Sequence, residues 1–463
     1  MAYRTWQMRR NTAALAAASN PVLAAGEPGF ETDTGKIKIG NGTRTWNTLP
    51  AYDPASQIPS LLNRVLSITD ATGNALEIYQ VWIPYFLSEG FSQANLNGLL
   101  CGGFWIDKYQ ACQPAASNVS RGGLTPDSPG SGVGAACKPH VVPWANISWN
   151  TAKTVLENRG GSGNVGSGTC ANNAATDLDG VSEFLVSDIT HLVGRHLELT
   201  VGGTTYYRRI IQTGKASATS AEIPKCVQFY PDLPSGVTIT YATDTYRIVG
   251  HHMITAYEWF SLAAWAMKYR YQYSLGYPKG NNDYGKDIGD TRGVQVEGLA
   301  DPIQPGDATH DLKRVLTGSG PATWSLNGRE DGVWDLNGNI WEWVLQKVTT
   351  DGSGMVIATG YPGEGISVLP TGISGQKITA LYAPDAPVSG QSMASHIFAP
   401  SALSASGVAE FGYCSAGWDL TAGTYATRKG GYWNDALNAG IWSTSDSFQP
   451  ALTVTNVGIR GVF

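Results

Sequence analysis

The stretch "DGVWDLNGNIWEW", Asp331 to Trp343, sets three tryptophans among glycine, asparagine and aspartate. Glycine permits sharp turns, and Asn and Asp side chains hydrogen-bond the backbone of such turns. Each tryptophan buries a large area and needs a partner for its indole N–H. The pattern predicts a core that is held together by packed loops as much as by regular elements.

The same stretch has a second interpretation, as a calcium-binding loop. Asp335, Asn337 and Asn339 occupy the first, third and fifth positions of such a loop. The sixth position should be glycine and is Ile340, and no glutamate stands at the twelfth. We therefore expect turn-stabilising side chains here, with no metal and no cofactor.

The composition is that of a globular protein rich in loops. Of the 463 residues 42% are hydrophobic and only 15% are charged, with 56 glycines, 15 tryptophans and 21 tyrosines. The net charge of -6 argues against a nucleic-acid binder, which needs clustered positive charge. No run of eighteen apolar residues occurs, so we expect no membrane insertion.

The chain divides into three parts. Residues 1–52 form a unit in which Asn41-Gly42, flanked by "KIKIG" and "TRTW", predicts a tight hairpin. Residues 53–98 are expected to be a β-rich linker or stalk, and residues 99–463 one large domain. Within it, residues 181–248 are expected to be an inserted β segment with a hairpin at Gly202-Gly203.

Two helices have clear end signals. One begins near Trp149 after Ser148 as N-cap and stops at Gly160. The other follows Thr255, and Glu258 three residues later completes a capping box. After Gly276 the sequence shows no regular period, and none runs through residues 428–450.

Several motifs, in a common order, resemble a known domain. They are "GFWIDKYQ" (103–110), "ISW" (147–149), Tyr257-Glu258-Trp259, residues 331–343 and the closing "VGIRGVF" (457–463). Together they resemble the C-type lectin-like domain of the formylglycine-generating (sulfatase-modifying) enzymes and of diversity-generating retroelement variable proteins. The resemblance covers residues 99 to the end and implies an α+β, loop-rich fold.

The N-terminus resembles a different family. "NPVLAAGEPGFETDTGKIKIGNGTRTWNTLP", residues 20–50, is similar to the short N-terminal repeat of phage tail-fibre proteins. This resemblance implies a small β-rich attachment and trimerisation domain on a virion. So short a unit buries little core alone, and oligomerisation is the usual remedy.

The enzymatic branches of the lectin-like family imply residues that this chain lacks. The formylglycine-generating branch needs a cysteine pair in the C-terminal part, where only Cys414 follows Cys226. The iron-binding branch needs clustered histidines; His251 and His252 are adjacent, and we expect them to be surface or capping residues. Cys101, Cys112 and Cys137 are either disulfide-bonded in part or free buried thiols. We expect no catalytic residues and no enzyme.

The variable-protein branch implies a fixed frame around rewritten positions. The frame residues, which would be the scaffold of the site, are Gly430, Gly431, Trp433, Gly440, Trp442, Gly458 and Arg460. In the variable region, 428–463, the resemblance implies ligand-binding residues that an altered Asn codon can encode: Tyr432, Asn434, Asp435, Leu437, Asn438, Ser443, Ser445, Asp446, Ser447 and Phe448. Tyr, Phe, Ser and Asn are also what antibody paratopes use.

The function that these resemblances imply is that of a phage receptor-binding protein of the tropism-determinant class, located at a tail-fibre tip. Its expected partners are a host surface receptor (protein or glycan), other tail proteins through the N-terminal domain, and further copies of itself in a homotrimer. Three alternatives stay open: a glycan-binding tail fibre of fixed specificity, a polysaccharide-cleaving tail spike, and a bacterial surface-displayed variable protein. The last should carry a secretion signal, which is only outlined at residues 8–27.

Overall fold

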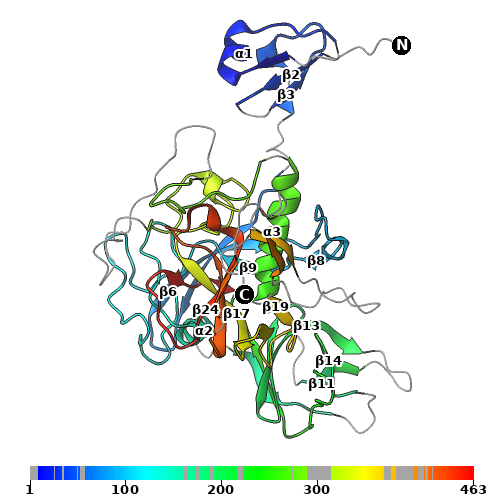
Figure 1. Ribbon diagram of the computed structural model, residues 1–463, viewed down its shortest axis with the longest axis vertical. Coiled ribbons are helices and arrows are strands. Elements are labelled where there is room, and N and C mark those ends of the chain that lie inside the picture. The colour runs from blue at the N-terminus through cyan, green and yellow to red at the C-terminus, as the bar shows by residue number, and fades with distance from the viewer. Residues whose placement is uncertain are drawn as a thin grey trace.

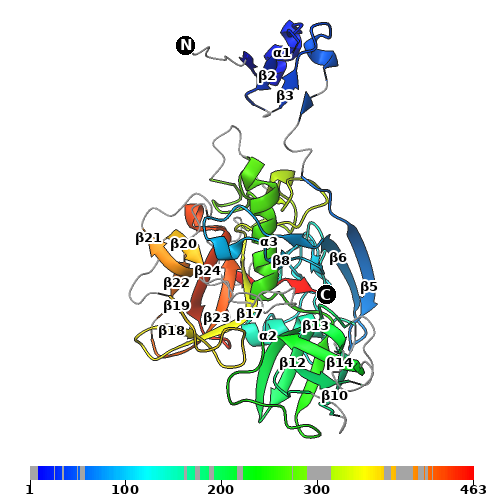
Figure 2. The ribbon, with the colours of Figure 1, turned by 90° about the vertical axis from the view of Figure 1, so that its right-hand side faces the viewer.

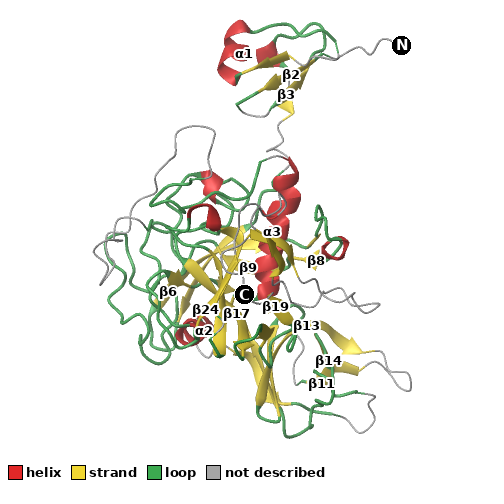
Figure 3. Ribbon diagram, in the orientation of Figure 1, coloured by secondary structure: helices red, strands yellow, loops and turns green. Residues whose placement is uncertain are grey.

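The structure is a computed structural model, and the chain it shows is mostly β with few helices (Figure 3). It describes residues 9–25, 27–33, 36–49, 51–52, 58–160, 164–172, 178–186, 192–215, 223–273, 275–288, 314–369, 377–381, 400–404, 411, 416–419 and 421–463. Within these residues no helix has the length and apolarity to cross a membrane.

The N-terminal unit is a small α/β body at one end of the ribbon (Figure 1). Its sheet has the order β1-β2-β3-β4, made of Arg9–Asn11, Pro28–Glu31, Ile37–Ile39 and Ala51–Tyr52. Helix α1 (Ala13–Ser19) begins after Thr12, whose hydroxyl accepts a hydrogen bond from the N–H of Leu15. The core of this body is small: Ala16, Leu23, Trp46 and Leu49.

The hairpin predicted at Asn41-Gly42 is wrong. β3 pairs with β2 and with β4, but β4 begins only at Ala51, and residues 43–49 directly after the Asn-Gly pair form no strand. Instead the Asn41 Oδ1 accepts hydrogen bonds from the N–H groups of Thr43 and Arg44, at 3.1 and 2.8 Å. Gly42 does take a positive φ of 79°, as the Asn-Gly signal requires. The chain then turns away, because Trp46 packs into the small core.

The larger body contains a five-stranded sheet that joins both ends of the domain. Its order is β16-β26-β9-β6-β5, made of His252–Met253, Gly461–Val462, Phe104–Asp107, Ala75–Ile83 and Asn63–Thr69. The segment 53–98, expected to be a linker, thus supplies β5 and β6 to this sheet. Two short strands nearby, β7 (Phe86–Leu87) and β8 (Leu100–Cys101), pair with each other.

The second sheet of the larger body is seven-stranded. Its order is β19-β18-β17-β23-β24-β22, made of Ser367–Leu369, Met355–Ile357, Trp341–Thr350, Gly423–Gly430, Gly440–Phe448 and Ala416–Trp418, and β25 (Val457–Gly458) pairs with β17 off this path. β20 (Lys377–Leu381) and β21 (Pro400–Ser404) form a separate pair.

Both predicted helices of this body are confirmed. α2 (Trp149–Glu157) begins at Ser148, whose hydroxyl accepts from the N–H of Thr151. α3 (Ala256–Tyr269) has both halves of the capping box between Thr255 and Glu258. Figure 2 shows α3 standing between the seven-stranded sheet and β6–β8. Residues 256–267 are all buried, because the helix is packed on every side.

The inserted β segment has its own sheet and core. Its order is β10-β15-β12-β13-β14-β11, made of Asn164–Thr169, Thr245–Val249, His196–Val201, Thr204–Lys215, Ile223–Tyr230 and Glu183–Leu185. An isolated bridge between Ala171 and Leu185 connects its two edges. The hairpin predicted at Gly202-Gly203 is confirmed, with Val201 opposite Thr204. The sheet starts at β10, before the expected boundary at residue 181.

The expectation that His251 and His252 are surface or capping residues is wrong, because both are buried. The His252 Nε2 lies 3.0 Å from Glu258 Oε1, and the His251 ring packs 4.6 Å from the ring of Phe463. Burial lowers the pKa of His251 well below its usual value. His191, His310 and His396 lie outside the described residues.

Of the two interpretations of the cysteines, the structure has free thiols. Cys101, Cys112, Cys137, Cys170 and Cys226 are buried and unbridged, and Cys414 lies outside the described residues. Burial raises the pKa of Cys101 and of Cys112 to about 12, so these thiols stay protonated and unreactive near neutral pH.

The tryptophan-rich stretch, residues 331–343, connects loops from several parts of the larger body. Asp335 and Asn339 take positive φ values of 60° and 62°. The Asp335 Oδ2 accepts from the N–H of Gly318 at 2.8 Å, and the Asn339 side chain bridges Gln110 and Val315 at 2.8 Å each. These amides and carboxylates hold loops from distant parts of the chain, as turn-stabilising side chains do.

Next to that stretch lies a buried ion pair between Arg460 and Glu342. The Arg460 Nε and Nη2 each donate to a Glu342 oxygen at 2.7 Å, and both side chains are almost fully buried. The same guanidinium donates to the carbonyls of Asp107 and Trp334 at 2.9 and 2.8 Å. A second buried pair, Arg159 with Asp107, follows directly on β9.

We expect Arg460→Met to lower the free energy of unfolding by about 3–5 kcal/mol, because it leaves the buried Glu342 carboxylate without its cation. The control is Arg329→Met, which removes a half-exposed arginine whose ion pair with Asp331 spans 3.7 Å. That change should cost about 1 kcal/mol or less. Denaturation followed by circular dichroism compares the two, and equal losses would contradict the role given to Arg460.

Burial raises the pKa of the Asp335 carboxyl to about 6. A raised carboxyl pKa favours the folded state at acid pH, and that stability is lost as pH rises from about 4 to about 6. Asp335→Asn stays neutral and keeps the acceptor for Gly318. As pH rises from 4 to 7, we expect the free energy of unfolding of the wild type to fall by about 3 kcal/mol relative to that of the variant. Thermal melting of both proteins at pH 4 and pH 7 tests this. The same difference in stability between them at both pH values would contradict it.

Candidate functional site

The first part of the variable region comprises the end of β23, the whole of β24 and the loop between these antiparallel strands, residues 431–439, which we call the display loop. β23 and β24 place Arg428 opposite Ser445 and Gly430 opposite Gly440. Residues 440–448 form a regular strand, although no strand period runs through them in the sequence. Seven of its nine residues are buried, so both faces are covered and the alternation that marks a half-exposed strand is absent.

Glycines set the path of the display loop. Gly430 and Gly431 have φ values of 93° and 84°, which side chains disfavour. A Cβ on Gly431 would lie 2.5 Å from the Cβ of Ala439, so the two ends of the loop approach too closely for any side chain there. A short 3-10 helix, Ala436–Asn438, then returns the chain to β24.

The display loop is attached to the tryptophan-rich stretch and to residues 281–285. The N–H of Trp433 donates to the carbonyl of Asn339 at 3.1 Å, and its own carbonyl accepts from the N–H of Tyr284 at 2.9 Å. The N–H of Ala436 donates to the carbonyl of Asn282 at 2.8 Å. The Asp435 Oδ2 accepts from the N–H of Tyr432 at 3.0 Å. The loop backbone is thus held from both sides.

Trp442 secures the strand side of the loop through an aromatic cluster. Its ring lies 5.3 to 6.3 Å from the rings of Phe411, Phe91, Phe260 and Tyr277. The Trp259 Nε1 of α3 donates to the carbonyl of Ile441 at 2.6 Å. These contacts fasten β24 to α3 independently of the side chains that the loop presents.

Gly458 and Arg460 lie behind the loop. Gly458 is opposite Glu342 in the β17–β25 pair, and a Cβ there would meet Ile340 Cδ1 at 2.4 Å. The residues expected to form the scaffold are all buried: Gly430, Gly431, Trp433, Gly440, Trp442, Gly458 and Arg460.

The residues expected to bind the ligand fall into three layers of exposure. Asn434, Leu437 and Asn438 are exposed at the tip of the loop. Tyr432, Asp435, Ser447 and Phe448 are half-buried. Ser443, Ser445 and Asp446 are buried within β24.

The buried layer is already hydrogen-bonded inside the protein. The Ser443 hydroxyl donates to the carbonyl of Asn438, and the Asp446 Oδ1 accepts from the hydroxyl of Thr427 at 2.6 Å. Ser445 Oγ lies 3.0 Å from Ser447 Oγ. In this chain these side chains support the loop and its neighbours from beneath.

Arg428 links the layers, and the sequence analysis did not single it out. Its guanidinium lies over the rings of Phe448 and Trp341, at 4.3 and 4.7 Å, and its Nη2 donates to Ser445 Oγ at 3.1 Å. Burial lowers its pKa to about 10, so it stays charged at neutral pH. An arginine just before a glycine pair has no distinctive pattern, and only the pairing with Ser445 reveals its place.

Burial also raises the pKa of Asp435 to about 6 and shifts that of Asp446 upward. The site therefore combines two buried cations, Arg428 and Lys429, with the carboxyl group of Asp435 and the aromatic rings of Tyr432 and Phe448. Lys377 and Tyr284 border it: Lys377 Nζ donates to Asn438 Oδ1 at 2.5 Å, and the Tyr284 ring packs 5.2 Å from that of Trp433. Both are far away in sequence, and no local signal points to them.

Comparison with known proteins identifies the N-terminal unit. Residues 7–44 match the family described as "Major tropism determinant N-terminal domain". No curated protein matches the chain. Among solved structures, variable protein 1 of Treponema denticola is 12% identical, with 87% of this chain and 98% of that chain covered and a TM-score of 0.29.

Two tropism-determinant structures give similar results. The U1 and I1 variants of the major tropism determinant are each 13% identical over 99% of this chain and 98% of theirs, with a TM-score of 0.19. All these TM-scores lie below 0.5, so the assignment rests on the N-terminal match. The match of residues 7–44 to the model of the major tropism determinant N-terminal domain confirms the resemblance of the chain to the tropism determinants.

Proposed function

We propose that this protein is a phage receptor-binding tail protein whose C-terminal part, with a C-type lectin-like fold, presents a diversified ligand surface on the display loop. The proposal rests on one observation: within residues 428–448, the residues that hold the backbone are different from those with exposed side chains. Glycines and tryptophans hold the backbone through contacts that do not involve the exposed side chains. The side chains of Asn434, Leu437 and Asn438 can therefore change without loss of the fold.

The chemistry of the loop suits recognition of varied partners. Tyr432 and Phe448 offer rigid contact area at small entropic cost, while Asn434 and Asn438 offer adaptable hydrogen bonds. Half-buried aromatic residues beside a buried arginine are typical of the residues that dominate binding energy at interfaces. The receptor, whether protein or glycan, would contact the loop tip first and the aromatic pair next.

The N-terminal match supports attachment to a tail. We propose that the small body of residues 9–52 joins other tail proteins and assembles the chain as a homotrimer, because its own core is only a few side chains. Several copies on one virion would strengthen weak individual contacts through effective concentration. The protein would then act at the tail-fibre tip of the virion.

We propose binding without catalysis. The carboxylates around the loop, Asp435 and Asp446, are engaged by the Tyr432 N–H and the Thr427 hydroxyl. A polysaccharide-cleaving tail spike would instead use a pair of carboxyl groups that face a bound sugar. The two functions separate in one assay, because a cleaving enzyme releases new reducing ends from host polysaccharide and a binding protein does not.

We expect the double variant Tyr432→Ala/Phe448→Ala to reduce adsorption to host cells by at least about tenfold, since hot-spot aromatic residues each contribute about 2 kcal/mol or more. The matched control is Tyr273→Ala, an exposed tyrosine that is 39% accessible and lies outside the variable region. Adsorption is measured with purified protein on cells, together with thermal melting. If the double variant melts normally and adsorbs as well as the control, the display loop is not the receptor site.

A further inference from the structure

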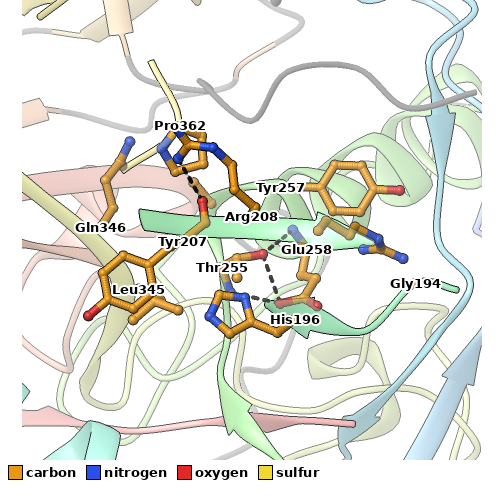
Figure 4. A pocket seen from close by; sticks show the side chains of 12 residues that line it. Gly194, His196, Tyr207, Arg208, Thr255, Tyr257, Glu258, Leu345, Gln346 and Pro362 are labelled. Atoms are coloured by element: carbon orange, nitrogen blue, oxygen red, sulfur yellow. Dashed lines mark hydrogen bonds between the residues drawn. The ribbon is translucent and has the colours of Figure 1, made fainter. Parts of the chain in front are cut away.

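A separate cavity lies where the inserted β segment meets the core of the larger body. His196 on β12 and residues 207–209 on β13 line one side of it (Figure 4). The other side is lined by residues 255–258 at the start of α3 and by Leu345 and Gln346 on β17. Its volume is about 30 Å³, roughly the space of two water molecules at about 10–15 Å³ each. None of the residues assigned to the display loop lines it.

Arg209 is the group in this cavity that calls for a ligand. Its residue is only 6% exposed, and its Nε and Nη2 are buried without a hydrogen-bond partner among the described residues. The guanidinium lies over the Tyr257 ring, 4.6 Å from its centre, so its plane is held in position. Leaving buried guanidinium donors unpaired is costly.

The neighbouring charges have partners, although the Nε of Arg208 is also buried without a hydrogen bond among the described residues. Arg208 donates to Glu364 Oε1 at 3.2 Å and to the carbonyl of Gly360 at 3.2 Å. Glu258 accepts from the backbone and hydroxyl of Thr255 at 2.8 Å each and lies 3.0 Å from His252 Nε2. The Glu258 oxygens are therefore occupied, while Arg209 keeps donors for a molecule that enters the cavity.

We propose that this cavity binds the carboxylate group of a small ligand, with Arg209 as its anchor. The flat guanidinium presents two parallel N–H donors, which match the two oxygens of a carboxylate. The fixed negative charge of Glu258 nearby disfavours a doubly charged phosphate or sulfate. The rings of Tyr207 and Tyr257 and the side chains of Leu345 and Pro362 provide an apolar surround for a short carbon group. The carboxylate belongs either to a free acid or to an acidic sugar or peptide group.

The test uses the full chain with sodium formate and sodium acetate as probes, at an ionic strength matched with sodium chloride. A ligand that binds only the folded state raises the melting temperature according to its affinity. We expect both carboxylates to raise it and chloride or phosphate to leave it unchanged. Arg209→Gln should weaken carboxylate binding by about tenfold or more, since hydrogen bonds to a charged group are lost. Arg44→Gln, which removes an exposed arginine from the N-terminal body, is the matched control.

If Arg209→Gln does not fold, a second variant tests the site instead. Ala256→Leu keeps Arg209 and a good helix former while placing three more carbons in the cavity. Loss of the carboxylate effect in this variant supports the site. Equal stabilisation by phosphate or chloride, or an unchanged carboxylate effect in both variants, would overturn it. To separate the two sources, glucuronate and a short aspartate-containing peptide are then compared with formate in the wild type.

Discussion

The buried pair of Arg460 and Glu342 ties together the segments that meet in the core of the larger body. It joins the segment between β25 and β26 to the start of β17, and the remaining donors of Arg460 reach the carbonyls of Asp107 and Trp334. Burying a charge is costly unless it is paired and hydrogen-bonded, and this guanidinium meets that need by joining three segments: its own, the end of β9 and residues 331–343. The backbone of the same stretch also holds the display loop, because the Asn339 carbonyl accepts from the N–H of Trp433 and the N–H of Gly338 donates to the carbonyl of Gly430.

As a result, the residues that hold the backbone of the display loop are different from those whose side chains the loop exposes. The backbone of Trp433 bonds to Asn339 and Tyr284, and Trp442 sits in an aromatic cluster against α3. The tip residues make few contacts that the fold needs. The layer beneath is different, because Ser443, Ser445 and Asp446 are buried and hydrogen-bonded. Changes there would have to fit a closed space, whereas the side chains of Asn434 and Leu437 are exposed.

Local signals in the sequence predicted local structure well. The caps at Ser148 and Thr255 and the hairpin at Gly202-Gly203 are present because each depends on a few neighbouring residues. The failures share one cause, which is that tertiary packing decided the outcome. After Asn41-Gly42, Trp46 packs into the small N-terminal core. β24 shows no polar–apolar alternation because both of its faces are covered. His252 is buried beside Glu258. At the site, the glycines and tryptophans that the sequence singles out as a frame are all buried. Arg428, Tyr284 and Lys377 were not singled out, since their role depends on distant pairings.

The central claim is that residues between the framing positions are diversified for binding, and the DNA that follows the coding sequence tests it most directly. The account predicts a near-copy of the final coding segment, differing mainly at adenines and accompanied by a reverse-transcriptase gene. The differing codons should include those for Tyr432, Asn434 and Phe448 and spare those for Trp433 and Trp442. A downstream sequence without such a copy, or a copy whose differences fall on the framing tryptophans, would contradict it.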